Sequence, residues 1–183
     1  YMLGAMFYNG YGVRQNYDKA FEWYQKSAEQ GDDSAEMMLG LMYYQGESVS
    51  QDDHKAFEWY QKSAEQGNVE AQYEFGLMFY DGKGVRQDKV IAKEWLQKSA
   101  EQGKANAQYV LGAMFYNGDG VPQNYDKAFE WYQKSAEQGD SSSQYMLGLC
   151  YQLGNGVRQD NTKAFEWLQK AAEQGDSDAQ LKL

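Results

Sequence analysis

The sequence is poor in the residues from which covalent and metal-dependent sites are built: Cys150 is its only cysteine and His54 its only histidine. A single cysteine excludes an intramolecular disulfide, so packing alone must hold the fold together. Positive charge is also scarce, because 17 lysines and arginines face 27 aspartates and glutamates and leave a formal net charge of -10. A surface of this sign repels phosphate backbones, so we expect no nucleic-acid partner.

Long apolar runs are missing as well. No stretch approaches the roughly 20 apolar residues that span a bilayer, and no basic start followed by an apolar segment resembles a signal peptide. We therefore expect no membrane span in this segment. The sequence opens with Tyr1 rather than with methionine, so it resembles a processed or excised piece from which a targeting segment could have been removed. The compartment stays open on these grounds.

What the sequence has in abundance is repetition. The eleven residues FEWYQKSAEQG occur three times, at 21–31, 57–67 and 129–139. Three landmarks keep a spacing of 36 residues through five copies without an insertion: Trp23, Trp59, Trp95, Trp131 and Trp167; Gly4, Gly40, Gly76, Gly112 and Gly148; and Gly31, Gly67, Gly103, Gly139 and Gly175. A period of this length predicts a repeat architecture. With 42% apolar and 16% aromatic residues, the chain has ample material for its core.

Each period is expected to hold two helices joined by a short loop. The second helix of the second period has an apolar side and a polar side at helical spacing: Ala56, Trp59, Tyr60, Ser63 and Ala64 against Glu58, Gln61, Lys62 and Glu65. Asp52 stands at its N-cap, and the other copies also have capping residues there: Asn16, Asp88, Asn124 and Asp160. Gly67 and its equivalents are expected as left-handed C-caps. Glu58 and Lys62 have the spacing of an ion pair on the outer face.

The first helix of each period is too apolar to stand alone. In the second period Ala35, Leu39 and Tyr43 form one packing side, on which Gly40 allows a close approach, and further apolar residues surround the rest: Met37, Met38, Leu41, Met42 and Tyr44. One helix pair cannot bury so much apolar surface, so neighbouring pairs must stack. We therefore predict an all-α fold, an α/α superhelical solenoid of five 36-residue helix-turn-helix repeats plus the start of a sixth.

We expect a single repeat domain over residues 1–183. Its first repeat is N-terminally incomplete and its sixth is only begun, and the expected ranges are 1–32, 33–68, 69–104, 105–140, 141–176 and 177–183. The loop between the helices usually holds two glycines suited to positive φ, such as Gly10 and Gly12, whereas the second copy has Ser48 at the second position. That loop is expected to be strained by about 1 kcal/mol or differently shaped.

Two motifs carry a resemblance to a known family. The pattern A-x3-L-G-x2-Y-x2-G-x-G-V, followed by K-A-x2-W-x2-K-[AS]-A-x2-G, runs through residues 107–121, with Phe115 at the tyrosine position, and 127–139. Over essentially its whole length the chain resembles the Sel-one-like repeat (SLR) family, relatives of tetratricopeptide repeats. In the third copy Ile91 and Lys93 replace the usual Lys and Phe, so that copy is expected to offer a different outer surface.

The resemblance implies an α/α solenoid that acts as an adaptor or scaffold, often in bacterial surface, secreted or signalling contexts. It therefore favours a bacterial periplasmic or secreted location over a cytoplasmic one. A cysteine-rich branch of the family closes each repeat with a disulfide. This chain has one cysteine, so the properties of that branch are not expected here.

Few residues qualify for chemistry. His54 is expected to be an exposed helix-start residue, since neither an oriented partner nor convergent metal ligands accompany it. Cys150 takes the place of methionine in the other copies, so we expect a small buried hydrophobe rather than a nucleophile. Asp52 with Asp53, and Asp119, lack the ligand pattern of a calcium loop, and the glycine-rich loops follow helices where a phosphate-binding loop follows a strand. We therefore expect no catalytic residue, no metal and no cofactor.

Two columns of side chains mark the candidate partner-binding surface. The first column lies near the ends of the first helices: Tyr8, Tyr44, Tyr80 and Tyr116, followed by Gln152. The second column lies seven residues earlier: Tyr1, Met37, Tyr73, Tyr109 and Tyr145. A spacing of seven brings both columns to one helix face, and the family resemblance places this face in a concave groove. Tyrosine suits recognition, but it equally suits packing between repeats, and both interpretations stay open.

The leading hypothesis is a non-enzymatic scaffold whose concave groove binds a peptide or protein partner, basic or neutral because the rim is acidic. An alternative is a cell-wall or small-ligand binding protein or hydrolase, which requires a localised pocket of convergent polar groups. A further alternative is a self-assembling spacer array with end-to-end association. It follows from first helices that are interrupted at both chain ends, where solenoids normally carry polar caps.

Overall fold

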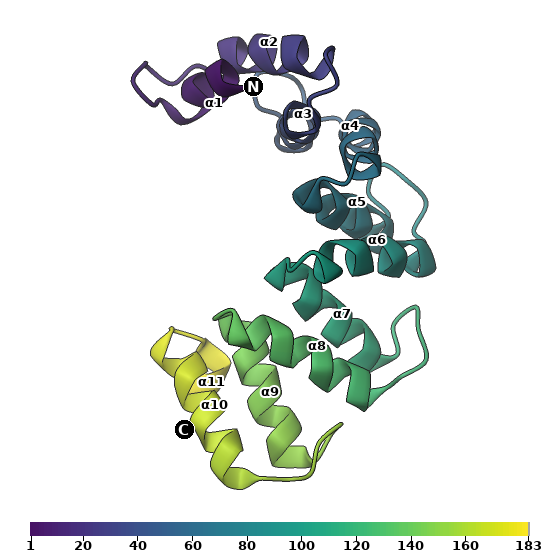
Figure 1. Cartoon of the computed structure of the whole chain (residues 1–183), viewed down its shortest axis with the longest axis vertical. Coiled ribbons are helices and arrows are strands. Elements are labelled where there is room, and N and C mark those ends of the chain that lie inside the picture. The colour runs from purple at the N-terminus through teal and green to yellow at the C-terminus, as the bar shows by residue number, and fades with distance from the viewer. Residues whose placement is uncertain (183) are drawn as a thin grey trace. The chain divides into compact units, whose positions relative to one another are not determined.

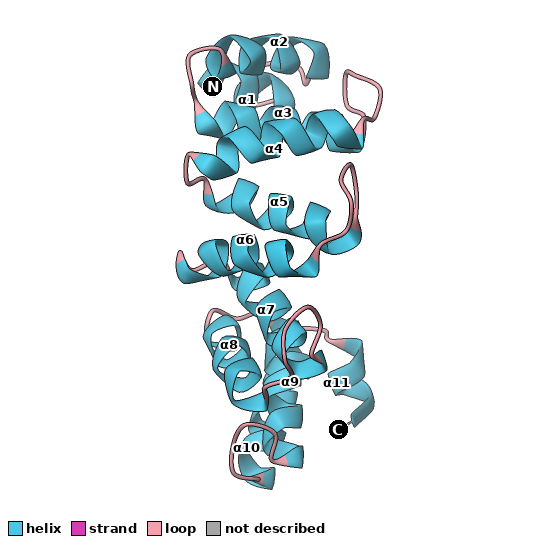
Figure 2. Cartoon of the chain, turned by 90° about the vertical axis from the view of Figure 1, so that its right-hand side faces the viewer, coloured by secondary structure: helices cyan, strands magenta, loops and turns pink. Residues whose placement is uncertain are grey.

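The computed structural model describes residues 1–182, and every regular element in that range is a helix (Figures 1 and 2). The described chain forms eleven α-helices with these bounds: α1 Met2–Asn9, α2 Tyr17–Ala28, α3 Asp33–Gln45, α4 Asp53–Glu65, α5 Val69–Asp81, α6 Lys89–Glu101, α7 Ala105–Asn117, α8 Tyr125–Glu137, α9 Ser141–Leu153, α10 Asn161–Glu173 and α11 Ser177–Lys182. The all-α fold of helix pairs that repeat every 36 residues is thereby confirmed. Leu183, the end of the expected sixth repeat, lies outside the described residues.

The helices form two compact units, Tyr1–Trp95 and Leu96–Leu183. In the first unit α1 packs on α2, α2 on α3, α3 on α4 and α4 on α5. In the second unit α7 packs on α8, α8 on α9, α9 on α10 and α10 on α11. Each of these helices contacts its neighbours in the sequence, as expected of stacked repeats. A single domain over residues 1–183 stays a prediction.

The second helices begin and end where their cap residues require. Asp52 accepts hydrogen bonds from the amides of His54 and Lys55, at 3.1 and 3.0 Å, and the capping residues of the other four copies accept equivalent bonds: Asn16, Asp88, Asn124 and Asp160. After the helix Gly67 has a φ of 100°, and its amide donates to the carbonyl of Ala64 at 3.0 Å. The predicted N-caps and left-handed glycines are confirmed.

The outer face differs from its prediction at one recurring contact. Instead of reaching Glu58, the ammonium of Lys62 lies 4.1 Å from the centroid of the Trp59 ring. Equivalent contacts of 4.1 to 4.6 Å occur in three other repeats: Lys26 on Trp23, Lys134 on Trp131 and Lys170 on Trp167. A cation and an indole three residues apart lie on one helix side, where their attraction is worth about 0.5–1 kcal/mol when exposed.

Two clusters of the hydrophobic core lie between consecutive repeats. One cluster joins Tyr24 and Ala28 of α2 to Leu39 and Met42 of α3, and a second joins Tyr60 of α4 to residues of α5: Ala71, Phe75 and Met78. The second helix of one repeat therefore shares its buried surface with the first helix of the next. This arrangement explains why a single helix pair has no complete core of its own.

The loop that carries Ser48 keeps the conformation of the glycine loops. Ser48 has a φ of 66°, against 72° for Gly12 and 65° for Gly84. It is the one non-glycine residue with positive φ among residues 1–182. Its hydroxyl donates to Oδ1 of Asp18 in the preceding repeat at 2.7 Å. The serine therefore holds a left-handed conformation that costs roughly 1–2 kcal/mol and forms a contact to the preceding helix pair.

Candidate functional site

Three tyrosines of the first column are hydrogen-bonded to the following repeat. Lys83 Nζ donates to the hydroxyl of Tyr44 at 2.6 Å, and Asn155 Nδ2 donates to the hydroxyl of Tyr116 at 3.0 Å. Both donors stand between the two loop glycines of the next repeat. The hydroxyl of Tyr8 donates to Gln45 Oε1 at a longer 3.4 Å. The rings are half-buried, so at these positions the column takes part in joining one repeat to the next.

The remaining tyrosine of the first column, Tyr80, and the tyrosines of the second column are partly covered as well. Tyr80 is half-buried on α5, with Lys89 Nζ 5.0 Å from the centroid of its ring. Three tyrosines of the second column are also half-buried: Tyr73, Tyr109 and Tyr145. The hydroxyls of Tyr109 and Tyr145 make no hydrogen bond to the described residues. Donors of this kind are free to bond to a partner.

A third set of tyrosines, from the second helices, lies beneath both columns. Tyr24, Tyr60 and Tyr132 are each 1% exposed. The ring centroid of Tyr132 lies 5.9 Å from that of Tyr109 and 6.3 Å from that of Tyr116. In the first repeat, Tyr24 lies at 5.8 Å from Tyr1 and 6.4 Å from Tyr8 in the same way. Each of these two rings therefore joins one member of each column into a three-ring cluster.

The glycine of the first helix makes room for this buried ring. A Cβ atom on Gly112 would lie 2.6 Å from Cδ1 of Tyr132, and one on Gly4 or Gly40 would meet Tyr24 or Tyr60 at 2.7 or 2.6 Å. Carbon atoms do not approach so closely without displacing a neighbour. The sequence interpretation assigned these glycines to close helix approach and missed the ring over them. The available signal was the large apolar residue that follows the recurrent tryptophan: Tyr24, Tyr60, Leu96, Tyr132 and Leu168.

Burial keeps the tyrosine hydroxyls neutral. It raises the pKa of Tyr24, Tyr60 and Tyr132 above the ordinary value. The pKa of Tyr8 rises for the same reason, and the carboxylate of Glu47 raises it further. The pKa of Tyr109 is raised by burial and then by nearby carboxylates, first Asp140. Such groups act as hydrogen-bond donors and as contact surface at neutral pH and are not suited to general-base chemistry.

The residues considered for other chemistry have local structural roles. His54 is exposed in the first turn of α4, as predicted. Cys150 is fully buried, as predicted, and burial raises the pKa of its thiol to about 11. The amide of Asp119 donates to the carbonyl of Met114 in a turn at 2.9 Å. Residues 1–182 contain no group of three or more His, Cys, Asp or Glu side chains placed to hold a metal ion.

None of the helices in the described part of the chain is both long and apolar enough to cross a bilayer.

Comparisons with known proteins follow the same period. The family model described as Sel1 repeat matches residues 1–32, 33–68, 69–104, 105–140 and 141–176. A protective antigen of uropathogenic Escherichia coli with an SLR fold is 40% identical at a TM-score of 0.95, over 100% of this chain and 39% of the antigen. This chain therefore spans well under half of that relative. No curated protein matches the sequence.

Two further solved structures extend the comparison. A Sel1 repeat protein from Oxalobacter formigenes is 32% identical at a TM-score of 0.90, over 97% of this chain and 71% of its own length. Cysteine rich protein B of Helicobacter pylori is 26% identical at a TM-score of 0.57, over 73% of this chain and 96% of its own length. The present chain has a related fold with a single cysteine.

Proposed function

The chain belongs to the Sel1 repeat family, whose members are generally non-catalytic scaffolds for protein–protein interaction, and on this premise we propose that it binds a peptide or protein partner across the tyrosine-bearing face of its first helices. The observation that carries the proposal is the three-ring cluster of Tyr109, Tyr132 and Tyr116. A cluster of this kind offers a rigid, largely apolar surface with hydroxyl groups at its edge, which is the composition favoured at binding hot spots.

Hydrogen bonding favours different roles for the two columns. The hydroxyls of Tyr44 and Tyr116 are engaged by the next repeat, whereas those of Tyr109 and Tyr145 make no bond within the described residues. This difference supports a partner contact centred on the second column, with the first column as its supporting framework. The net charge of -10 favours a basic or neutral partner.

The proposal is tested with peptides selected from a random displayed library on the immobilised chain, whose dissociation constants are then measured by fluorescence anisotropy. Tyr109→Phe combined with Tyr145→Phe removes two hydroxyls and keeps both rings. At about 1 kcal/mol for each hydrogen bond, the pair is expected to weaken binding roughly tenfold or more.

Tyr125→Phe is the matched control. Tyr125 is 37% exposed at the start of α8, and its hydroxyl accepts a bond from Gln123 Nε2 within its own repeat. This variant is expected to bind the selected peptides as the unmodified chain does. If the double variant also binds them with unchanged affinity while remaining folded, the assignment of the second column is wrong.

We further propose that the chain itself has no catalytic activity. The burial of Cys150, the raised pKa of its thiol and the exposed position of His54 support this, because a nucleophile needs an accessible anion and an oriented base. Turnover of a substrate that disappears on His54→Ala or Cys150→Ala substitution in a folded chain would contradict it.

A further inference from the structure

All three arginines of the chain occupy one position of the repeat. Arg14, Arg86 and Arg158 each follow the valine of the loop between the two helices, in repeats 1, 3 and 5. Repeats 2 and 4 have Ser50 and Pro122 there. All three arginines are exposed, and none of their guanidinium groups makes a hydrogen bond or ion pair with residues 1–182. In a chain with a net charge of -10, these unpaired cations are concentrated at equivalent loops.

Each arginine lines an open cleft built from the same repeat positions. The cleft of repeat 1 has a volume of about 870 Å³, and those of repeats 3 and 5 have about 490 and 420 Å³. The shared lining consists of an aromatic side chain of the first helix, the loop valine, the arginine, a glutamine and the helix cap: Phe7, Val13, Arg14, Gln15 and Asn16; Phe79, Val85, Arg86, Gln87 and Asp88; Tyr151, Val157, Arg158, Gln159 and Asp160.

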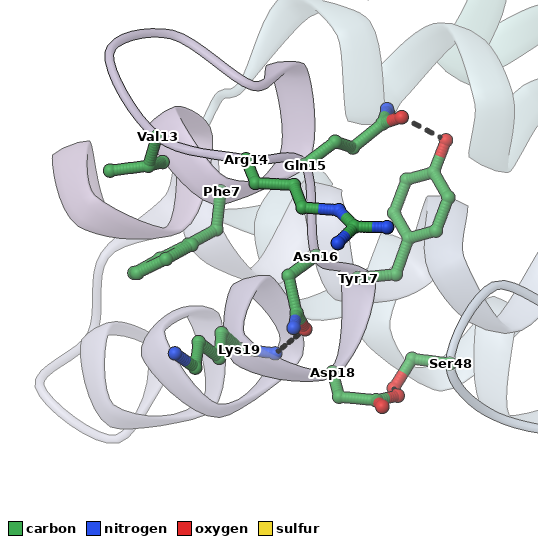
Figure 3. A pocket seen from close by; sticks show the side chains of 9 residues that line it. All are labelled: Phe7, Val13, Arg14, Gln15, Asn16, Tyr17, Asp18, Lys19 and Ser48. Atoms are coloured by element: carbon green, nitrogen blue, oxygen red, sulfur yellow. Dashed lines mark hydrogen bonds between the residues drawn. The ribbon is translucent and has the colours of Figure 1, made fainter.

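The loop is fixed by the glutamine that follows the arginine. Gln15 Nε2 donates to the carbonyl of Tyr8 at 2.8 Å and to the hydroxyl of Tyr17 at 3.1 Å. The backbone amide of Lys19 donates to Asn16 Oδ1 at 2.9 Å. Because this amide is already hydrogen-bonded, a ligand in the cleft would bind to side chains. Figure 3 shows the side chain of Arg14 extended across the cleft between Asn16 and Tyr17. A pinned backbone lowers the entropy cost of presenting the guanidinium group.

A second cation accompanies the arginine in two of the three clefts. Lys19 Nζ lies 5.3 Å from the ring centroid of Phe7, and Lys163 Nζ lies 5.4 Å from that of Tyr151. Both lysines line the clefts of their repeats. In repeat 3 the same position holds Ile91. The chain therefore contains two clefts with two cations and one natural variant with a single cation.

The cleft of repeat 1 extends to repeat 2, since Ser48 of that repeat belongs to its lining. At two other junctions the glycine loop lies close against the start of the preceding helix: a Cβ on Gly84 would overlap the carbonyl of Asp53, and one on Gly156 would overlap that of Tyr125. Ser48 carries a Cβ at this position, so its loop must keep more distance. The hydroxyl of Ser48 donates a hydrogen bond to Asp18 Oδ1 at 2.7 Å, and Ser48 is part of the cleft lining.

We propose that the cleft of repeat 1 binds a single glutamate or aspartate side chain of a protein partner that is otherwise neutral or basic, with Arg14 as the bidentate donor and Lys19 as a second positive charge in the lining of the same cleft. The guanidinium fork matches the geometry of a carboxylate, and no protein acceptor competes for it. The carboxylate of Asp18 also lines the cleft and accepts the hydroxyl bond of Ser48. The cleft of repeat 5 binds the same group more weakly because it is smaller, and that of repeat 3 binds it weakest because it lacks the lysine.

The site does not depend on the tyrosine columns and has its own test. Because the chain contains only three arginines, a nitrogen-15 spectrum of the arginine Nε–Hε groups contains one signal for each cleft. Arg14→Lys, Arg86→Lys and Arg158→Lys variants assign these signals. The probe is the peptide acetyl-Gly-Glu-Glu-Gly-amide, and acetyl-Gly-Gln-Gln-Gly-amide is its uncharged control.

The acidic peptide is expected to shift the Arg14 signal saturably at the lowest concentration, with Arg158 next and Arg86 last. Lys19→Ile copies repeat 3 and is expected to raise the dissociation constant at Arg14 about threefold, the effect of one exposed charge contact. Ile91→Lys is expected to lower it at Arg86 by a similar factor.

Three results would overturn the proposal. One is a linear, equal response of all three signals, which indicates unspecific ionic contact. Another is an equal response to the glutamine control peptide. The third is tighter binding of acetyl-Gly-Gln-Gln-Gly with a free carboxyl end, which would assign the cleft to a chain terminus instead of an acidic side chain.

Discussion

The junction between repeats 1 and 2 and the junction between repeats 4 and 5 pair equivalent helices, α2 with α3 and α8 with α9, but differ in their polar contacts. At the second junction, Gln144 Nε2 donates to the carbonyl of Ala136 at 3.3 Å, and its Oε1 accepts a bond from Gln174 at 2.7 Å. Gln72 and Gln108 repeat the donation to the preceding helix. A neutral side-chain amide both donates and accepts, so it is able to bond to both repeats at each of these buried contacts.

At the first junction Glu36 stands in the place of that glutamine. It is 6% exposed and accepts a bond from Gln66 Nε2 at 2.6 Å. An ionised carboxylate has no proton to give to the carbonyl of Ala28, the counterpart of Ala136. Burial raises the pKa of Glu36, Asp33 and Asp32 add to this, and Gln66 and Lys62 oppose it. The comparison shows that this architecture accepts an ionisable joint and makes its stability dependent on pH.

The loops of the two junctions also differ in one residue, which is polar at the first junction and a glycine at the second. Ser48 holds a φ of 66° at the first junction, where Gly156 holds 69° at the second. The residue at this position has nearly the same φ at both junctions, and its side chain decides how closely the loop approaches the preceding helix. At the first junction a carboxylate, Glu36, replaces the glutamine, and a strained serine, Ser48, replaces the glycine.

The largest effect is expected from giving the second junction the serine of the first. In Gly156→Ser the new Cβ overlaps the carbonyl of Tyr125 and the residue is held at positive φ. A left-handed non-glycine residue costs roughly 1–2 kcal/mol and an overpacked contact about 1–3 kcal/mol, so we expect a loss of about 3 kcal/mol in the free energy of unfolding. Urea denaturation followed by circular dichroism measures it.

The reverse change is the control. Ser48→Gly removes the strained residue and also the bond to Asp18, so a net gain of about 1 kcal/mol or less is expected. If Gly156→Ser unfolds at the same urea concentration as the unmodified chain, the two loops are interchangeable and the difference between the junctions has no energetic meaning.

Local features of the fold follow from residue type alone, which explains why they were predictable. A cap such as Asn124 or a terminal glycine such as Gly139 acts within one helical turn. Donation from Gln144 to Ala136 depends instead on how two helices of different repeats are placed, and a repeating pattern does not fix that distance. The sequence therefore predicted the helices and their order but left the chemistry of the joints open.

The candidate site divides along the same line. The tyrosine columns were visible because a spacing of seven residues places side chains on one helix face. The position of Tyr132 over Gly112 was not visible in the sequence, because the ring of Tyr132 could pack against several apolar positions of the neighbouring helix. Nor did the sequence show that Asn155 occupies the hydroxyl of Tyr116, because this bond crosses a junction.

An intermediate effect is expected from exchanging the polar residues of the joints. Glu36→Gln restores an amide that is able to donate to Ala28, and it is expected to stabilise the chain by about 1 kcal/mol at neutral pH. Gln144→Glu should destabilise the second junction by a similar or larger amount, because a buried carboxylate loses its hydration and is unable to donate to the carbonyl of Ala136, which keeps the bond from the amide of Gly139. Urea denaturation at several pH values measures both.

The sign of the pH dependence follows from the raised pKa of Glu36. Below its ordinary pKa the carboxyl is protonated in both states, and the penalty is absent. Between the ordinary and the raised pKa the folded state binds more protons than the unfolded state, so stability falls as pH rises. The advantage of Glu36→Gln should therefore grow from pH 4 toward neutral pH. An advantage that is constant over this range would contradict the role assigned to the buried carboxyl.

The smallest effect is expected at the hydroxyls of the first tyrosine column. Asn155→Ala removes the 3.0 Å donation to Tyr116 in a partly buried place, and a loss of about 0.5–1 kcal/mol follows. Gln45→Ala removes the 3.4 Å contact of Tyr8 in an exposed place and should cost less than half of that, because hydrogen bonds weaken with length and exposure. Equal losses in thermal denaturation would mean that the two junctions use their tyrosines alike, and the contrast between them would then be confined to Glu36 and Ser48.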